Sequence, residues 1–250
     1  MKYLAFLALS ILSSSLSAST EESESFLSTE TSVEAPAFQW VQVPGALKQI
    51  AVGSDSLVYG VNSADNIYYR FAGQWFQLPG ALKDISVGGD GTVWGVNSGN
   101  AIYRGTSQQW INVPGALVQI DVGDYNNVWG VNAGGNIYRW NGADWNQIAG
   151  ALTQVSVGSD GTVWGVNSAG NIYKYTNGGW VQVPGGLKVV AVGSRTNVWG
   201  VNSAGNIYKL NYDETWTQVP GGLSWIDVAA DGTVWGVNSA GNIYISAAPY

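Results

Sequence analysis

The sequence of 250 residues contains no cysteine and no histidine. Without cysteine there are no disulfides and no thiol chemistry, so the stability of the fold must come from a packed core. Without histidine the chain lacks the commonest general base and the commonest zinc ligand. No Asn-x-Ser/Thr sequon occurs, so N-glycosylation is not expected.

Long apolar runs and basic clusters are also missing. Beyond the N-terminus nothing approaches the roughly 18 consecutive apolar residues of a membrane span, so no membrane insertion is expected. The formal net charge is −7, of which residues 38–250 contribute −3 through 12 acidic and 9 basic side chains. A nucleic-acid partner would need a clustered basic face, which the sequence does not provide.

The first 37 residues differ from the rest. Lys2 is followed by an apolar run from Leu4 to Leu12 and then by small residues, with Ser15 and Ser17 spaced as signal peptidase prefers. Residues 1–18 are therefore predicted to be a signal peptide, and the protein is expected to be secreted and extracellular. Residues 19–37, rich in Ser, Thr and Glu, predict a flexible acidic leader that cannot offset its own ordering entropy.

The rest of the chain repeats. The phrase Val-Trp-Gly-Val-Asn has its tryptophan at Trp94, Trp129, Trp164, Trp199 and Trp235, with Tyr59 in a first, weaker copy. A second phrase, Trp-x-Gln-Val-Pro-Gly in its commonest form, begins at Trp40, Trp75, Trp110, Trp145, Trp180 and Trp216. Successive copies of the first phrase are 35 or 36 residues apart. Such a period is typical of a propeller or a stacked array, because one unit cannot bury its own apolar face.

Each unit predicts four short strands. In the cleanest copy, the strand patterns cover residues 152–158, 162–167, 171–175 and 180–183, and tight turns rich in Gly, Asn and Asp separate them. No stretch has helical periodicity. Residues 38–250 are therefore predicted to form one all-β domain, a six-bladed β-propeller with four antiparallel strands per blade.

Two details sharpen this prediction. The array opens with a lone strand, 40–43, and stops one strand short after Tyr244, so the N-terminal strand is predicted to complete the last blade and close the ring. One turn position before the Asn-Ile-Tyr strand holds only Asp, Asn or Gly, the residues that best tolerate a left-handed backbone: Asp65, Asn100, Gly135, Gly170, Gly205 and Gly241.

The copies Val-Trp-Gly-Val-Asn-Ser-Ala-Gly-Asn-Ile-Tyr and Trp-Val-Gln-Val-Pro-Gly-Gly-Leu resemble tectonin repeats, the unit of tectonins, fish-egg lectins and lipopolysaccharide-binding tachylectins. The resemblance covers residues 38–250. It implies a propeller that binds carbohydrate, often on bacterial surfaces, and has no catalytic activity. The chain departs from the family by lacking cysteine and by having Tyr59 for Trp, Ala101 for Asn and Ala149 for Pro. The first and second repeats are therefore expected to have weakened sites.

The two rims of the predicted ring differ in sequence. One rim, which we call the uniform rim, carries the turns after Val-Trp-Gly-Val-Asn and the Pro-Gly-Gly-Leu links between blades. Its asparagine column is invariant across the six copies: Asn62, Asn97, Asn132, Asn167, Asn202 and Asn238. The opposite, variable rim reads Ser-Asp-Ser, Gly-Asp-Gly, Asp-Tyr-Asn, Ser-Asp-Gly, Ser-Arg-Thr and Ala-Asp-Gly. Sites that repeat around the ring are expected on the uniform rim.

Sugar recognition needs a flat apolar surface and several amide or hydroxyl partners. The candidate carbohydrate-binding residues are Trp94, Asn97, Trp129, Asn132, Trp164, Asn167, Trp199, Asn202, Trp235, Asn238, Arg104, Arg139, Lys174 and Lys209. The tryptophans of the first phrase have two interpretations, core between the blades or partly exposed sugar platform, and core is favoured. The tryptophans of the second phrase are expected to pack against the neighbouring blade.

The remaining candidates also have structural alternatives. Asparagine at a strand end often caps a turn, and a basic residue on a strand can simply protect a sheet edge. The basic residues could otherwise bind anionic sugars or phosphate. Trp140 and Trp225 lie outside both tryptophan columns and are candidates for a contact that does not repeat.

No enzyme, metal or cofactor is expected. Asp90, Asp160 and Asp231 all lie in Asp-Gly turns, and Glu214 is the only glutamate beyond the leader. A propeller glycosidase would need two suitably spaced carboxylates, or a tyrosine nucleophile with arginines at the axis. No zinc-site spacing or calcium loop is present.

The sequence thus favours a secreted, multivalent lectin. Its partners would be glycans on cell or microbial surfaces, such as bacterial lipopolysaccharide, bound in agglutination or innate defence. The alternative is an extracellular protein-binding or structural propeller that uses Tyr125, Tyr212 and Trp225 of the variable part of the repeat.

Overall fold

The computed structural model describes residues 38–106 and 109–247. The chain divides into two units, Met1–Pro36 and Ala37–Tyr250, and the second unit is the one whose structure follows. The predicted signal peptide (1–18) and acidic leader (19–37) lie outside the described residues.

The described residues form six four-stranded antiparallel sheets and no helix, which we number as blades in chain order. Blade 1 consists of β2 (Gln49–Ser54), β3 (Leu57–Val61), β4 (Asn66–Phe71) and β5 (Gln74–Ala81). Blade 2 consists of β6 (Asp84–Val87), β7 (Val93–Val96), β8 (Ala101–Gly105) and β9 (Trp110–Ala116). Blade 3 consists of β10 (Gln119–Asp124), β11 (Asn127–Val131), β12 (Ile137–Trp140) and β13 (Trp145–Ile148).

The other three blades repeat this plan. Blade 4 consists of β14 (Gln154–Val157), β15 (Val163–Val166), β16 (Ile172–Thr176) and β17 (Gly179–Val183). Blade 5 consists of β18 (Val189–Ser194), β19 (Asn197–Val201), β20 (Ile207–Leu210) and β21 (Trp216–Val219). Blade 6 consists of β22 (Trp225–Val228), β23 (Val234–Val237), β24 (Ile243–Ser246) and β1 (Trp40–Val43).

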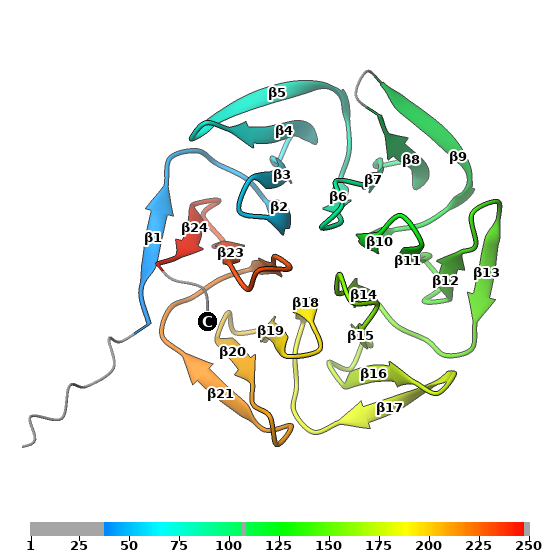
Figure 1. The fold of residues 1–250 in the computed structure, drawn as a ribbon, viewed down its shortest axis with the longest axis vertical. Coiled ribbons are helices and arrows are strands. Elements are labelled where there is room, and N and C mark those ends of the chain that lie inside the picture. Colours follow the sequence, from blue (N-terminus) through cyan, green and yellow to red (C-terminus); the bar gives the residue numbers. More distant parts are fainter. Residues whose placement is uncertain (1–37, 107–108, 248–250) are drawn as a thin grey trace, which may run out of the picture. The chain divides into compact units, whose positions relative to one another are not determined.

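The blades stand side by side around a common axis, with the first strand of each blade innermost and the fourth outermost (Figure 1). The predicted six-bladed propeller is therefore confirmed. In blade 4 the four strands fall within two residues of the predicted ranges. Short apolar, β-branched and aromatic runs bounded by turn residues were enough to place these strands, because both faces of each sheet pack on neighbouring blades.

The ring closes as the sequence predicts. Strand β1 pairs antiparallel with β24 in the register Trp40↔Ser246, Val41↔Ile245, Gln42↔Tyr244 and Val43↔Ile243. A segment at the start of the array thus supplies the outer strand of the last blade. Neither end of the array is left as an unpaired sheet edge, a feature that would otherwise invite aggregation.

The core lies between blades and repeats with them. Each of six apolar clusters joins residues of neighbouring blades, for example Trp199 and Val201 of blade 5 with Ile226 and Val228 of blade 6. The tryptophans of the first phrase are buried, from Trp199 at 0% to Trp164 at 4% exposed. Their core interpretation is confirmed, and the sugar-platform interpretation of Trp94, Trp129, Trp164, Trp199 and Trp235 is wrong, since a buried indole offers no face to a ligand.

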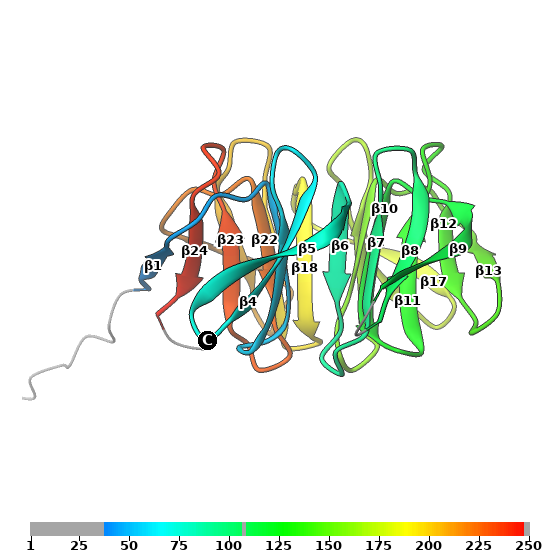
Figure 2. The ribbon, with the colours of Figure 1, turned by 90° about the horizontal axis from the view of Figure 1, so that it is seen from above.

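The loops gather at two opposite ends of the strands (Figure 2). The turn between the second and third strands of one blade bonds to the link entering the next blade, as in Leu187 N–H to Gly170 O at 3.0 Å. The same bond spans the closure, from Leu47 N–H to Gly241 O at 3.0 Å. These turns and links therefore form one rim, the uniform rim, as the strand order predicts.

The variable rim has a regular pattern of its own that sequence reasoning missed. In blades 2, 4 and 6 a turn aspartate accepts the backbone N–H of the next blade: Asp90 from Tyr125 at 2.9 Å, Asp160 from Arg195 at 2.9 Å and Asp231 from Asp55 at 3.2 Å. Blades 1, 3 and 5 carry a bulge between their first two strands instead. The differences between copies therefore alternate, and they join the six blades as three pairs at this rim.

Candidate ligand-binding rim

The invariant asparagine of the uniform rim organises its own turn. Asn167 Oδ1 accepts the N–H groups of Ala169 at 3.0 Å and Asn171 at 2.9 Å. The N–H of Asn171 or its equivalent is bonded in the same way in all six copies, by Asn62, Asn97, Asn132, Asn167, Asn202 and Asn238. The turn-capping interpretation of this column is confirmed. It uses the carbonyl oxygen and leaves the amide Nδ2 for other contacts.

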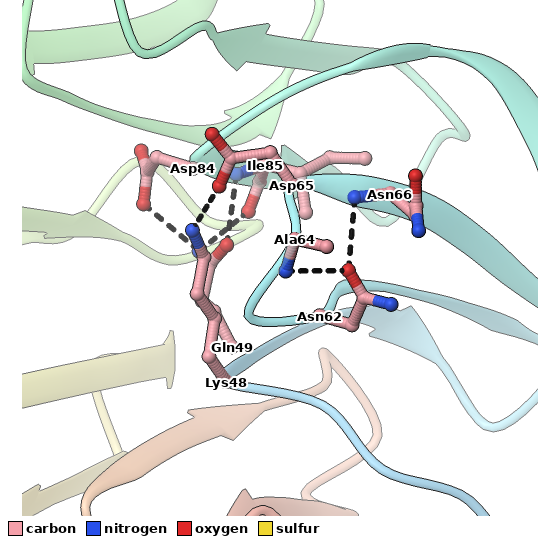
Figure 3. A network of polar contacts seen from close by, with 8 residues as sticks. All are labelled: Lys48, Gln49, Asn62, Ala64, Asp65, Asn66, Asp84 and Ile85. Atoms are coloured by element: carbon pink, nitrogen blue, oxygen red, sulfur yellow. Dashed lines mark hydrogen bonds and ion pairs between the residues drawn. The ribbon is translucent and has the colours of Figure 1, made fainter.

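The fourth residue of this turn has a left-handed backbone in every blade, with φ of 64° at Asp65, 69° at Asn100 and 80° to 85° at the four glycines. In blade 1 Asp65 pairs with Lys48, and in blade 2 Asn100 accepts a bond from Lys83 at 2.5 Å. Figure 3 shows the Asn62 turn beside the pair of Lys48 and Asp65. In the first two blades a lysine side chain therefore lies across the turn.

A tyrosine column, which sequence reasoning did not select, lies beside the asparagines. The Nδ2 of Asn167 is 3.5 Å from Tyr173 Oη, and the same distance recurs for Asn97 with Tyr103, Asn132 with Tyr138 and Asn202 with Tyr208. The signal was present in the sequence, because the Asn-Ile-Tyr strand keeps its tyrosine in all six copies: Tyr68, Tyr103, Tyr138, Tyr173, Tyr208 and Tyr244.

The tryptophans of the second phrase form the outer wall of the same rim. Most of them donate the indole Nε1–H to the proline carbonyl of the preceding link, as Trp75 does to Pro44 O at 3.0 Å. This bond is present in five copies, at Trp40, Trp75, Trp110, Trp145 and Trp216. Trp180 faces Ala149 instead, and its buried Nε1 has no acceptor among the described residues. All six rings are half-buried, so they pack against the neighbouring blade and keep part of their surface exposed.

These residues surround a pocket at the junction of two blades. In blade 1 the pocket has a volume of about 300 Å³ and is lined by Gly45, Ala46, Leu47, Asn62, Tyr68, Trp75 and Ile243. The link glycine permits the close approach, since a Cβ at Gly45 would lie 3.0 Å from both Trp75 Nε1 and Ile243 Cδ1. Gly115, Gly150, Gly185 and Gly221 meet the equivalent tryptophan and isoleucine just as closely. The wall of the pocket therefore recurs around the ring.

The predicted basic residues do not join this site. Their strand register places Arg104, Arg139, Lys174 and Lys209 opposite the buried tryptophans, toward the variable rim. Arg139 lies over Trp129 with its guanidinium carbon 5.7 Å from the ring centroid, and it donates to Asn127 Oδ1 at 3.2 Å. Lys174 pairs with Glu214 of the next blade. These basic residues thus lie at the opposite ends of the strands from the rim asparagines, and their role in sugar binding stays a prediction.

The axis of the ring holds a belt of buried polar side chains that sequence reasoning also missed. The side-chain amide of Gln154 bonds to the backbone of the next blade as a neighbouring strand would. Its Oε1 accepts Val190 N–H at 3.0 Å, and its Nε2 donates to Val190 O at 2.8 Å. Gln119 and Gln49 repeat the arrangement one and three blades earlier, as Figure 3 shows for Gln49, Asp84 and Ile85. The space left at the axis is about 10 Å³, room for about one water molecule, so the axis is a plug and not a ligand site.

Three carboxylates belong to this belt. Asp84 Oδ2 accepts Ile120 N–H at 2.8 Å, Asp121 Oδ2 accepts Val157 N–H at 2.6 Å, and Asp227 Oδ2 accepts Val52 N–H at 2.7 Å. Burial raises the pKa of Asp84 to about 8, against the N–H bond from Ile120, which lowers it. Burial likewise raises the pKa of Asp121 and Asp227. Each carboxylate ties one blade to the next.

Residues 38–106 and 109–247 contain no cluster of three or more acidic side chains placed to hold a metal ion. The same ranges contain no helix with the length and apolarity needed to cross a bilayer.

Six four-stranded sheets around an axis, with a repeated asparagine turn on one rim, define the molecule as a β-propeller with a tandem-repeat sequence. The sequence matches the Tectonin domain family over residues 17–74, 58–144 and 117–249, and the chain belongs to that family. A search of curated protein sequences finds no significant match.

Many solved structures share the fold. A virginiamycin B lyase from Staphylococcus aureus is similar with a TM-score of 0.58 at 19% identity, over 79% of this chain and 78% of the lyase. YCF48 from Cyanidioschyzon merolae has a TM-score of 0.54 at 16% identity, over 84% and 85% of the two chains. The WD40 propeller domain of Doa1 has a TM-score of 0.58 at 10% identity, over 84% and 97%. At these identities the likeness shows the fold alone.

Proposed function

We propose that this protein is a secreted multivalent lectin that binds surface glycans, such as bacterial lipopolysaccharide or other microbial sugars, through the pockets of its uniform rim. The observation that carries the proposal is the pocket of blade 1, where the Trp75 indole, fixed by its bond to Pro44, lies with Tyr68 and with Asn62, whose Oδ1 caps the turn and whose Nδ2 does not. The contact between the asparagine amide and the tyrosine hydroxyl is present in blades 2 to 5.

The chemistry of these groups suits a sugar. The exposed part of the outer tryptophan offers a flat surface for the C–H face of a pyranose ring, and its bond to the proline carbonyl fixes the orientation of that surface. The asparagine Nδ2 donates and the tyrosine Oη both donates and accepts, which matches the hydroxyl pattern of a sugar edge. The proposal includes no catalytic step.

Repetition supplies the affinity in this proposal. A single shallow site binds at about millimolar strength, corresponding to about −4 kcal/mol. Sites that face one surface raise the effective concentration for each other, and avidity then adds roughly 100-fold to 10,000-fold without new contacts. Pockets that all lie on one rim have the geometry this mechanism requires.

A glycan array that includes immobilised lipopolysaccharide tests the proposal. The full chain should be retained by a defined set of glycans, and a free monosaccharide at about millimolar concentration should release it. Agglutination of cells that display the same glycan should be reversed by the same monosaccharide. No retention on any glycan or lipopolysaccharide would contradict the proposal.

A protein-binding propeller is the second candidate, and a hollow on the variable rim favours it. Tyr125, which is 56% exposed, borders a pocket of about 240 Å³ together with Arg139, Trp140 and Asn146. Tyr212 is fully exposed on the same rim. Under this alternative, Tyr125→Ala and Tyr212→Ala abolish binding to cells while rim substitutions at Asn167 and Asn202 leave it unchanged. The lectin proposal predicts the reverse.

A further inference from the structure

Five of the six blade junctions are filled in the same way. The buried tryptophan of one blade is covered by a large side chain of the next, such as Trp140 on Trp94 with ring centroids 5.5 Å apart and Tyr175 on Trp129 at 5.1 Å. Three other pairs complete the set: Leu210 with Trp164, Phe38 with Trp199 and Arg70 with Trp235.

The junction of blades 1 and 2 departs from this pattern on both sides. Tyr59 replaces the tryptophan of blade 1, and Gly105 occupies the position that Trp140 and Tyr175 occupy in later blades. The ring of Trp110, on the outer strand, packs directly against Gly105, since a Cβ at Gly105 would lie 3.0 Å from Trp110 Cζ3. Both replacements therefore remove side-chain volume from the same junction, where the Trp110 ring lies over part of the uncovered position.

The result is a cleft of about 720 Å³, against about 300 Å³ for the rim pocket of blade 1. Tyr59, Tyr69 and Leu78 of blade 1 form one wall, and Val93 and Trp110 of blade 2 form the other. The volume falls within the range of roughly 300–1,000 Å³ that is typical of small-molecule sites. Apolar cavities left by a missing side chain accept apolar ligands that resemble the lost group.

The walls are aromatic and carry hydroxyls. Tyr59 and Tyr69 lie with centroids 6.3 Å apart, and Phe76, which is 41% exposed, stacks on Tyr69 at 5.4 Å and extends the aromatic surface outward. Burial, and then the neighbouring Tyr69, raises the pKa of Tyr59, so its hydroxyl stays protonated at neutral pH and can donate a hydrogen bond. No hydrogen bond to either tyrosine hydroxyl is made by the described part of the chain.

We propose that the cleft between blades 1 and 2 binds one planar aromatic small molecule of two fused rings, with a polar group on its edge. The fold itself indicates the shape, because the position left empty at Gly105 is filled in blade 3 by the fused rings of Trp140 and in blade 4 by the ring of Tyr175. Tyr59 and Trp110 provide the opposed surfaces, and the Tyr59 hydroxyl meets the polar edge. The site occurs once per chain, and its Trp110 and Gly80 also belong to the tryptophan column and the link of the uniform rim.

Calorimetric titration of the full chain with 2-naphthol tests this site. Its control is decahydro-2-naphthol, which has the same skeleton and hydroxyl but is not planar. We expect one 2-naphthol per chain and binding at least about tenfold tighter than that of the saturated analogue, a difference of about 1.4 kcal/mol. Equal binding of the two compounds, no binding of 2-naphthol, or several equivalent sites would each overturn the proposal.

Two variants locate the site. Tyr59→Trp restores the consensus residue, fills the cleft and should weaken 2-naphthol binding at least about tenfold without changing glycan retention. Tyr212→Ser, in the exposed turn of blade 5, should leave 2-naphthol binding unchanged. Unweakened binding to Tyr59→Trp overturns the proposal, and so does binding of N-acetyltryptophanamide in place of 2-naphthol, which would indicate the side chain of a protein partner.

A gain-of-site variant provides an independent check. Trp129→Tyr combined with Tyr175→Gly copies the unusual pair to the junction of blades 3 and 4, and the stoichiometry should rise from one to two. If the folded double variant still binds a single molecule, the pair does not define the site. Should that variant fail to fold, the result with Tyr59→Trp decides alone.

Discussion

At the scale of the residue, the two polar atoms of the rim asparagine side chain have different contacts. Its Oδ1 is committed to backbone N–H groups of its turn, while its Nδ2 lies 3.5 Å from a tyrosine hydroxyl. Capping a turn and contacting a ligand both require asparagine here, so the invariance of this residue across the six copies could not show which role it has. The hydrogen bonds of Oδ1 show that the asparagine caps its turn, and the lectin proposal depends on a ligand contact of Nδ2.

Substituting aspartate separates the two roles. Asn167→Asp and Asn202→Asp keep the acceptor that caps the turn and remove the amide donor, so avidity for the retained glycan should fall at least about tenfold. The free energy of unfolding should change by no more than about 0.5 kcal/mol, as at other surface positions. Surface plasmon resonance and thermal unfolding measure the two effects. Ser168→Ala is the matched control, and equal avidity of all variants would contradict a ligand role for Nδ2.

The buried tryptophans give the opposite prediction. Trp199 is 0% exposed, and Trp199→Ala should lower the free energy of unfolding by about 3–5 kcal/mol through lost burial and a cavity. Urea denaturation measures the loss. Glycan retention per folded molecule should be unchanged, and a selective loss of retention with normal stability would show that the core assignment is mistaken.

At the scale of the element, strands and turns were predictable from the sequence, whereas the site was only partly so. Period-2 alternation and Asp-Gly or Asn-Gly turns place strands such as β14–β17 to within two residues. The tyrosine column was missed because Tyr173 follows Ile172 in a strand pattern, and nothing local shows that its hydroxyl reaches the rim. The aspartate ties were missed because each joins two blades, as Asp90 and Tyr125 do from positions 35 residues apart. The bulges were missed because each is a shift of register between two strands of one blade, which the residue pattern does not show.

The pairing of β1 with β24, which closes the ring, can be fixed by a covalent bond. Val41 and Ile245 are directly opposed, and the chain has no other cysteine, so Val41→Cys with Ile245→Cys offers a single possible disulfide. Cross-linking across so long a loop should stabilise the ring by about 2–4 kcal/mol. Calorimetry with and without reductant measures this gain. An oxidised variant that melts no higher than the reduced one would argue against this pairing.

At the scale of the whole molecule, the polar belt couples the blades and should make stability depend on pH. Asp84, Asp121 and Asp227 have a raised pKa in the fold, so above the ordinary value of 3.8 the folded state binds more protons than the unfolded chain. The stabilisation that these three protonated carboxyls add to the free energy of unfolding is complete below pH 3.8 and is lost as the pH rises toward about 8. Each proton contributes a slope of up to about 1.4 kcal/mol per pH unit.

Thermal unfolding between pH 5 and 8 measures this slope, and the absence of histidine leaves that window free of imidazole titration. The melting temperature should be highest near pH 5 and fall toward pH 8. Asp84→Asn should reduce the slope by removing one titrating group. A melting temperature that rises from pH 5 to pH 8 would show that these carboxylates are ionised throughout.

The central claim is that one closed ring presents the same glycan pocket at several blade junctions. Native mass spectrometry of the full chain with a monosaccharide identified on the array counts the occupied pockets directly. We predict a series of adducts that extends beyond one and up to six per chain, and that disappears when all six rim asparagines are changed to aspartate. A single adduct at saturation, or a series that survives those substitutions, would contradict the claim.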